Sequence, residues 1–209
     1  MKIVFIHGAN ATAESFNYIR EHMEHQDGHL MFEYNSRDGF YYNLQHMIDE
    51  LEYITEDVFF VCHSLGGIYA LHLYNRFPDK IRGVLTLSTP YKGSSQADYA
   101  KYFLPFNMLL RDVGSHCAPI TESFDVKISI PWCAVVTTKG DSIWMVEPND
   151  GVVSIASMEY RKDMDLVHIP LNHYEIVMCP NVVKLINDRI TQAHDNTHRK
   201  RSKKSKKTN

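Results

Sequence analysis

The chain has 209 residues, 44% of them hydrophobic, which is enough for one domain with a sizeable core. It contains no apolar run of membrane-spanning length, and its body carries no helix-turn-helix, zinc or RNA-binding signature. The sequence therefore predicts no membrane-spanning helix, and no signature supports a nucleic-acid function for the body. The 4 cysteines are scattered and form no C-x-x-C pair, which favours free thiols in a reducing compartment. The chain opens directly on a strand-like run with no signal peptide before it, so we expect a cytoplasmic protein.

Short apolar runs alternate with segments of helical spacing along most of the chain. The predicted strands cover residues 2–6, 29–34, 58–62, 83–87, 132–138 and 166–170. The predicted helices cover residues 12–25, 41–54, 65–77 and 174–191. Strands that alternate with helices in this way predict an α/β fold, with a mostly parallel central sheet and helices on both faces.

A serine occupies the tight connection between the strand at 58–62 and the helix at 65–77. Ser64 follows the apolar run and is itself followed closely by Gly66. This is the outline of a nucleophile elbow, a strand-turn-helix that exposes the serine and strains its backbone, so that its neighbours must be small. Cys62 stands where the G-x-S-x-G pattern has its first glycine, so the match is incomplete. The alternative, non-catalytic role for Ser64 is that of a helix N-cap.

Three further motifs accompany the elbow, and their order along the chain is specific. They are His7-Gly8 after the first strand, Ser88-Thr89-Pro90-Tyr91-Lys92-Gly93-Ser94, and Asn149-Asp150-Gly151-Val152-Val153 followed by Asn172-His173. From Lys2 to about Arg189 the chain resembles the α/β hydrolase superfamily, and within it the small lipases and lipase-like esterases. The resemblance implies a minimal α/β-hydrolase domain over residues 1–192 that lacks the two opening strands of larger hydrolases. Residues 91–131 would form a lid-like insertion.

The resemblance also implies a catalytic role for particular residues. Ser64 would be the nucleophile, His173 the general base and Asp150 the acid that orients the histidine, in the order Ser, Asp, His of this superfamily. The oxyanion would be stabilised by the backbone N–H groups of Leu65, the residue after the nucleophile, and of Ala9. We assign no cofactor and no metal, because no oxygen-rich cluster of the kind that calcium needs is recognisable.

Two of these assignments have rivals in the sequence. Asp141 lies nearer the end of the strand predicted at 132–138, where many hydrolases place the acid, so it competes with Asp150. Among the 12 histidines, His116 in the middle insertion is the main rival of His173. The other histidines belong to structural motifs, to predicted strands and helices or to the tail.

The substrate class must come from the insertion at 91–131, which is rich in aromatic and aliphatic residues. An apolar cover over the site predicts a lipophilic or lipid ester as substrate, whereas the plain alternative is a helix packed on the sheet. An acyltransferase or a thioesterase with the same triad, and a non-catalytic hydrolase-like binding module, are the competing functional hypotheses.

Residues 193–209 form the last predicted unit, a disordered basic tail. Residues 198–209 hold seven Lys or Arg and no acid, and without these seven charges the formal net charge falls from −3 to −10. Such a tail could contact an anionic membrane, nucleic acid or a protein, or remain solvated with no dedicated partner.

Overall fold

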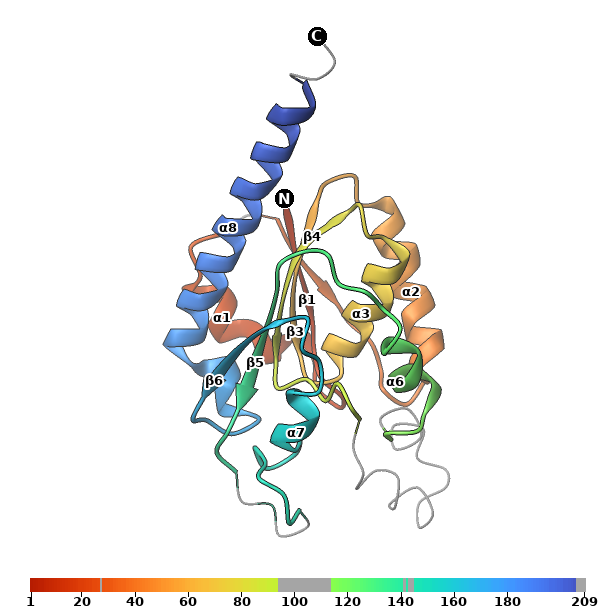
Figure 1. Ribbon diagram of the computed structural model, residues 1–209, viewed down its shortest axis with the longest axis vertical. Coiled ribbons are helices and arrows are strands. Elements are labelled where there is room, and N and C mark those ends of the chain that lie inside the picture. Colours follow the sequence, from red (N-terminus) through yellow and green to blue (C-terminus); the bar gives the residue numbers. More distant parts are fainter. Residues whose placement is uncertain (27, 94–113, 141, 143–144, 206–209) are drawn as a thin grey trace.

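A computed structural model of the protein describes residues 1–26, 28–93, 114–140, 142 and 145–205, with the backbone alone for 198–205 (Figure 1). The described strands form one sheet, in which every pairing is parallel and the order is β2-β1-β3-β4-β5-β6. The strands are β1 (Lys2–Ile6), β2 (His29–Phe32), β3 (Val58–His63), β4 (Ile81–Leu87), β5 (Trp132–Thr137) and β6 (Asp165–Ile169). Because all strands run the same way, their carboxyl ends meet at one edge of the sheet, which is where ligands bind in such folds.

Helices cover both faces of this sheet (Figure 1). On one side lie α2 (Phe40–Tyr53), α3 (Gly66–Arg76) and α6 (Ala118–Ser123), and on the other lie η1 (Ala13–Phe16), α1 (Asn17–His22) and α8 (Pro180–Ser205). The short elements α7 (Ile155–Met158) and η2 (Glu175–Met178) follow β5 and β6. The fold is therefore the three-layer α/β arrangement that the alternation of strands and helices predicts.

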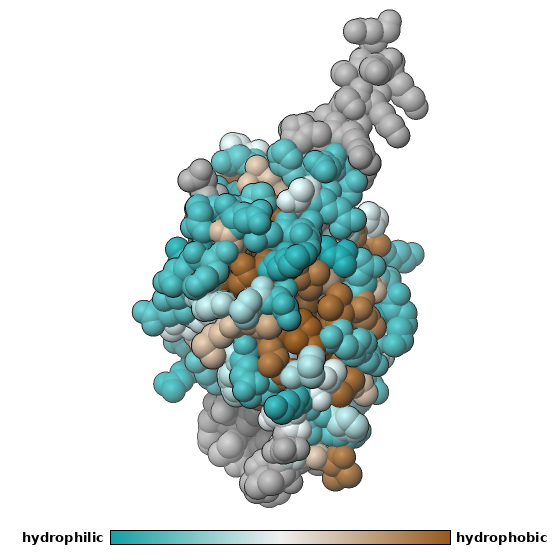
Figure 2. Space-filling view, turned by 90° about the vertical axis from the view of Figure 1, so that its left-hand side faces the viewer, coloured by the Kyte–Doolittle hydropathy of each residue, from teal (hydrophilic) through white to brown (hydrophobic). Residues whose placement is uncertain are grey.

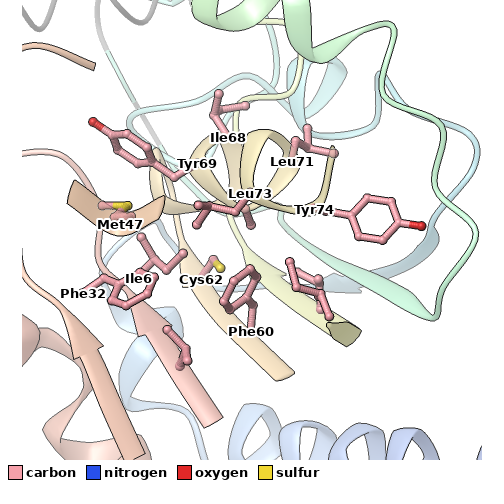
Figure 3. Close-up of a cluster of buried hydrophobic side chains, with 14 of the residues drawn as sticks. Ile6, Phe32, Met47, Phe60, Cys62, Ile68, Tyr69, Leu71, Leu73 and Tyr74 are labelled. Carbon is pink, nitrogen blue, oxygen red and sulfur yellow. The ribbon is translucent and has the colours of Figure 1, made fainter. Parts of the chain in front are cut away.

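The central strand β3 shows how the sequence produces these layers. All six of its residues are buried, since both faces of the strand are covered. Phe60 and Cys62 point into the cluster under α2 and α3, whereas Phe59 and Val61 point into the cluster under α1 and α8. Figure 3 shows the first of these clusters, in which Cys62 packs among side chains of the sheet and of α3.

The six predicted strands are all present; the first has the predicted boundaries, and those of the other five differ by one or two residues. The predicted first helix is instead a 3-10 turn followed by a helix of six residues. The predicted closing helix is divided at Cys179, whose backbone is extended, and Pro180 then opens α8. The larger part of the predicted lid-like insertion, 94–113, lies outside the described residues, and its described end forms α6.

The prediction that the chain is disordered from residue 193 differs from the structure, in which α8 continues to Ser205 and extends beyond the sheet (Figure 1). Ala193 is only 1% exposed and packs with the sheet, and the Thr197 hydroxyl donates to its carbonyl oxygen over 2.9 Å. A helix that is already nucleated by packing propagates easily, and Lys and Arg are good helix formers. The amino-acid composition of the tail does not reveal that the helix is already packed at Ala193.

The surface has a mixed character. Figure 2 shows the side of the molecule on which α1 and α8 lie, where apolar residues gather near the middle and hydrophilic residues surround them. No helix among the described residues is both long and apolar enough to cross a membrane. No disulfide joins the 4 cysteines, all of which fall within the described part of the chain.

Candidate active site

Ser64 lies at the turn that joins β3 to α3, and its backbone is strained. Its φ of 51° is in the left-handed region, which serine rarely adopts, and its N–H donates to the carbonyl oxygen of Leu87 over 2.8 Å. The turn approaches β1 so closely that a Cβ atom at Gly66 would lie 2.1 Å from the carbonyl oxygen of Ile6. Position 66 therefore requires glycine, as the elbow pattern predicts.

Cys62 explains why the elbow tolerates an incomplete motif. Its side chain is fully buried in the cluster under α3, so a small apolar residue other than glycine is accommodated there. Burial raises the pKa of its thiol well above the usual value. Cys62 is therefore a neutral core residue whose thiol is unreactive.

Asp150 and His173 form a buried pair at the carboxyl edge of the sheet. Asp150 lies in the loop between β5 and α7, and His173 follows β6. His173 Nδ1 lies 2.8 Å from Asp150 Oδ2, and the two side chains are 4% and 0% exposed. A second bond, from the backbone N–H of His173 to the carbonyl oxygen of Asp150 over 3.0 Å, ties the two loops together. The carboxylate only accepts, so Nδ1 carries the proton and Nε2 is left as the basic nitrogen.

The surroundings of Asp150 keep its carboxylate ionised. Its oxygens accept hydrogen bonds at Oδ1 from the backbone N–H of Val152 (3.0 Å) and Val153 (2.8 Å), and at Oδ2 from Thr137 Oγ1 (2.5 Å) and His173 Nδ1 (2.8 Å). Burial by itself raises the pKa of Asp150, but the bonds from His173, Thr137 and Val153 outweigh burial and the pKa is lowered.

His63 brings His173 next to the elbow. The His63 ring lies 4.8 Å from the His173 ring, centroid to centroid, and His63 Nε2 is 2.9 Å from the carbonyl oxygen of His173. His63 directly precedes Ser64, so the histidine loop packs against the base of the serine turn. Among the described residues, the Ser64 hydroxyl makes no hydrogen bond to His173.

The His7-Gly8 turn lies against Ser64 and His63. A Cβ atom at Gly8 would be 3.1 Å from the Ser64 Cβ, which shows how closely this turn approaches the serine. His7 holds the turn in place by stacking on Tyr34 at 4.2 Å, and the Tyr34 hydroxyl donates to the His7 carbonyl oxygen over 3.0 Å. Neither the N–H of Ala9 nor that of Leu65 donates to another group within the described part of the chain.

Of the two rivals, His116 does not join this arrangement and is exposed just before α6. The other rival, Asp141, lies outside the described residues. Sequence reasoning regarded His63 as structural and did not single out Thr137, because the contacts of both join segments far apart in the sequence. No group of three His, Cys, Asp or Glu side chains in the described ranges could hold a metal ion.

A parallel sheet with helices on both faces and a strained serine between β3 and α3 defines an α/β hydrolase. Residues 3–132 match the model of the alpha/beta hydrolase family, which is more than half of the chain, and the chain therefore belongs to this family. The match includes Ser64 and ends before Asp150 and His173.

Solved structures with the same fold include several enzymes. A metagenomic carboxyl esterase, MGS0156, superposes with a TM-score of 0.73 at 15% identity, covering 94% of this chain and 76% of its own. The mature lipase BlEst2 of Bacillus licheniformis superposes with a TM-score of 0.65 at 17% identity, covering 88% of this chain and 89% of its own. The Vlm2 thioesterase domain superposes with a TM-score of 0.55 at 19% identity, covering 88% of this chain and 93% of its own. At these identities the likeness shows the fold alone, and no curated protein sequence matches the chain.

Proposed function

We propose that the protein is a serine esterase that hydrolyses carboxylic esters through an acyl-enzyme, with Ser64, His173 and Asp150 as its triad. The observation that carries this proposal is the buried hydrogen bond of 2.8 Å between Asp150 and His173, at the same edge of the sheet as the strained Ser64. The carboxyl esterase and the lipase among the structures of the same fold support this reaction class.

The proposed first half-reaction acylates the serine. Ser64 Oγ attacks the ester carbonyl carbon while His173 Nε2 accepts the hydroxyl proton, and Asp150 stabilises the imidazolium that results. The oxyanion of the tetrahedral intermediate accepts hydrogen bonds from the backbone N–H groups of Ala9 and Leu65. When the intermediate collapses, the C–O bond to the alcohol breaks and His173 returns the proton to the leaving oxygen.

The proposed second half-reaction releases the acid. Water gives a proton to His173 Nε2 and attacks the acyl carbon, and the Ser64 oxygen leaves with that proton. Both steps need a hydrogen bond between Ser64 and His173, and in free enzymes such contacts are often long and tighten only when substrate binds. The enzyme is unchanged after one cycle, and one ester bond has been hydrolysed.

The substrate that we propose is lipophilic. Apolar side chains stand exposed directly beside two triad residues: Val152, two residues after Asp150, is 39% exposed, and Tyr174, next to His173, is 67% exposed. The composition of residues 91–131 adds to this proposal, although most of that insertion lies outside the described residues. Such an apolar border suits an acyl chain better than a charged substrate.

A chain-length series of p-nitrophenyl esters tests the proposed activity. Wild-type protein should hydrolyse them, with kcat/KM rising from the acetate to medium-length chains, whereas Ser64→Ala and His173→Gln should lose turnover. A thioester with the same acyl chain, and an added alcohol acceptor, distinguish a thioesterase or an acyltransferase from an esterase. Folded wild-type protein that turns over none of these substrates would contradict the proposal and favour a binding module.

A further inference from the structure

Two buried hydroxyl groups lie behind the carboxylate of Asp150. Thr137, the last residue of β5, places its Oγ1 2.5 Å from Asp150 Oδ2. Ser88, the residue after β4, places its Oγ 2.8 Å from the same Thr137 oxygen. Ser88, Thr137 and Asp150 are all 0% exposed, so water does not compete for these bonds.

The direction of each bond follows from the protons available. Thr137 has one hydroxyl proton, and its possible acceptors are the Asp150 carboxylate, the Ser88 hydroxyl at 2.8 Å and the Met158 sulfur at 3.4 Å. An ionised carboxylate is a stronger acceptor than a hydroxyl or a thioether, so the proton points to Asp150. The Thr137 oxygen then accepts from Ser88, and the chain of donors runs from Ser88 through Thr137 to Asp150.

Ser88 reaches this position at a conformational cost. Its φ is 53°, in the left-handed region, and its N–H donates to the carbonyl oxygen of Val135 over 3.0 Å. A non-glycine residue in this region is strained, and such strain concentrates at functional sites. The strain lies at the carboxyl edge, where the ends of β4 and β5 meet the loop of Asp150.

We propose that Thr137 is a positioning residue, supported by Ser88, which holds Asp150 Oδ2 in line with His173 and so sets the efficiency of the reaction. A carboxylate offers about four acceptor sites, and Asp150 uses as many, two at each oxygen. Without the Thr137 hydroxyl, Oδ2 keeps only the bond to His173. This inference rests on the proposed esterase function for its kinetic test, but not for its titration test.

The kinetic test compares Thr137→Val with Thr137→Ser on a soluble ester. Valine keeps the shape and removes the hydroxyl, and a hydrogen bond to a charged group is worth about a ten- to hundredfold change in rate. We expect kcat to fall by that factor in Thr137→Val with little change in KM, and serine to restore most of it. Ser88→Ala should cause a smaller loss of kcat, because Thr137 still donates to Asp150.

Thr86→Val is the matched control. Thr86 is also a fully buried threonine, on β4, but its hydroxyl pairs with Tyr91 at 2.6 Å and does not reach Asp150. We expect Thr86→Val to keep the wild-type kcat. An equal loss of kcat in Thr86→Val and Thr137→Val, or a wild-type kcat in Thr137→Val, would overturn the proposal.

A titration test probes the hydrogen bond between Thr137 and Asp150 without requiring catalytic turnover. Carbon-13 labelling of aspartate, with Asp150→Asn to assign the signal, follows the carboxyl of Asp150 by NMR. The Thr137 hydroxyl helps to lower the pKa of Asp150, so Thr137→Val should raise this pKa, whereas Thr86→Val and Thr137→Ser should not. An unchanged pKa in Thr137→Val would overturn the proposal even if the protein proved not to be an esterase. A raised pKa in a protein without esterase activity would refute only the proposed function.

Discussion

The Nε2–H of His63 donates a hydrogen bond of 2.9 Å to the main-chain oxygen of His173, 110 residues further along the chain. A carbonyl oxygen only accepts, so Nε2 carries the proton and Nδ1 is bare. Nδ1 is buried and has no hydrogen-bond partner among the described residues, and it faces the Gly8 turn. The residue before the serine thus connects the elbow, the histidine loop and the His7-Gly8 turn.

Removing the Nε2–H donor of His63 should lower kcat while the protein still folds. His63→Phe keeps an aromatic ring but cannot donate to the His173 carbonyl, so we expect kcat to fall by about tenfold, which is the value of one buried hydrogen bond. His63→Gln can keep a donor in place of Nε2 and should retain more activity than His63→Phe. Measurements of kcat on a soluble ester, with circular dichroism to verify folding, test whether activity decreases from wild type through His63→Gln to His63→Phe. Equal rates for wild type and His63→Phe would contradict this role.

The same residue should make stability depend on pH. Burial, and then the neighbouring His173, lower the pKa of His63 from 6.5 to about 3. Between these values the unfolded chain binds the proton and the folded protein does not. The free energy of unfolding therefore decreases as pH falls through this window, by at most about 1.4 kcal/mol per pH unit. His63→Gln lacks the group, so its stability in urea should decrease less steeply than that of wild type from pH 6.5 towards pH 4. Parallel curves for the two proteins would contradict the burial of a neutral His63.

Asp150 and its rival can be separated by charge-neutral substitutions. Asp150→Asn keeps the shape of the side chain but presents an amide instead of a carboxylate to His173, and this disturbs the tautomer of the histidine. We expect kcat to fall by about 10⁴-fold, as for the equivalent change in a serine protease. Asp141→Asn should retain turnover close to that of wild type. The reverse pattern on the same ester substrate would make Asp141 the acid.

The basic end of α8 should act independently of the site. A chain truncated after Thr197 loses seven positive charges and keeps the packed Ala193, so we expect an unchanged Tm and unchanged ester turnover. Full-length protein should bind a polyanion such as heparin at low salt and release it as salt rises, and the truncated protein should not bind. Equal retention of both proteins on a heparin column would contradict a role of these charges in binding.

Local patterns were enough to predict the strands and the strained serine turn, whereas the triad comes from the resemblance and stays a prediction. The buried runs such as Val58–His63 are unmistakable, and the glycine at 66 is required by a contact with Ile6. The sequence could not decide between Asp150 and Asp141 locally, because both follow β5 in the chain; the structure pairs Asp150 with His173, and Asp141 lies outside the described residues. The roles of His63 and Thr137 depend on strand order in space, which no short motif encodes.

The central claim is that Ser64 is an activated nucleophile, and fluorophosphonate labelling with intact-mass detection tests it most directly. We expect one adduct per chain on wild-type protein, no adduct on Ser64→Ala, and much slower labelling of Asp150→Asn. Equal labelling of wild type and Ser64→Ala would contradict the claim. So would folded wild-type protein that takes up no label, either in buffer or with detergent.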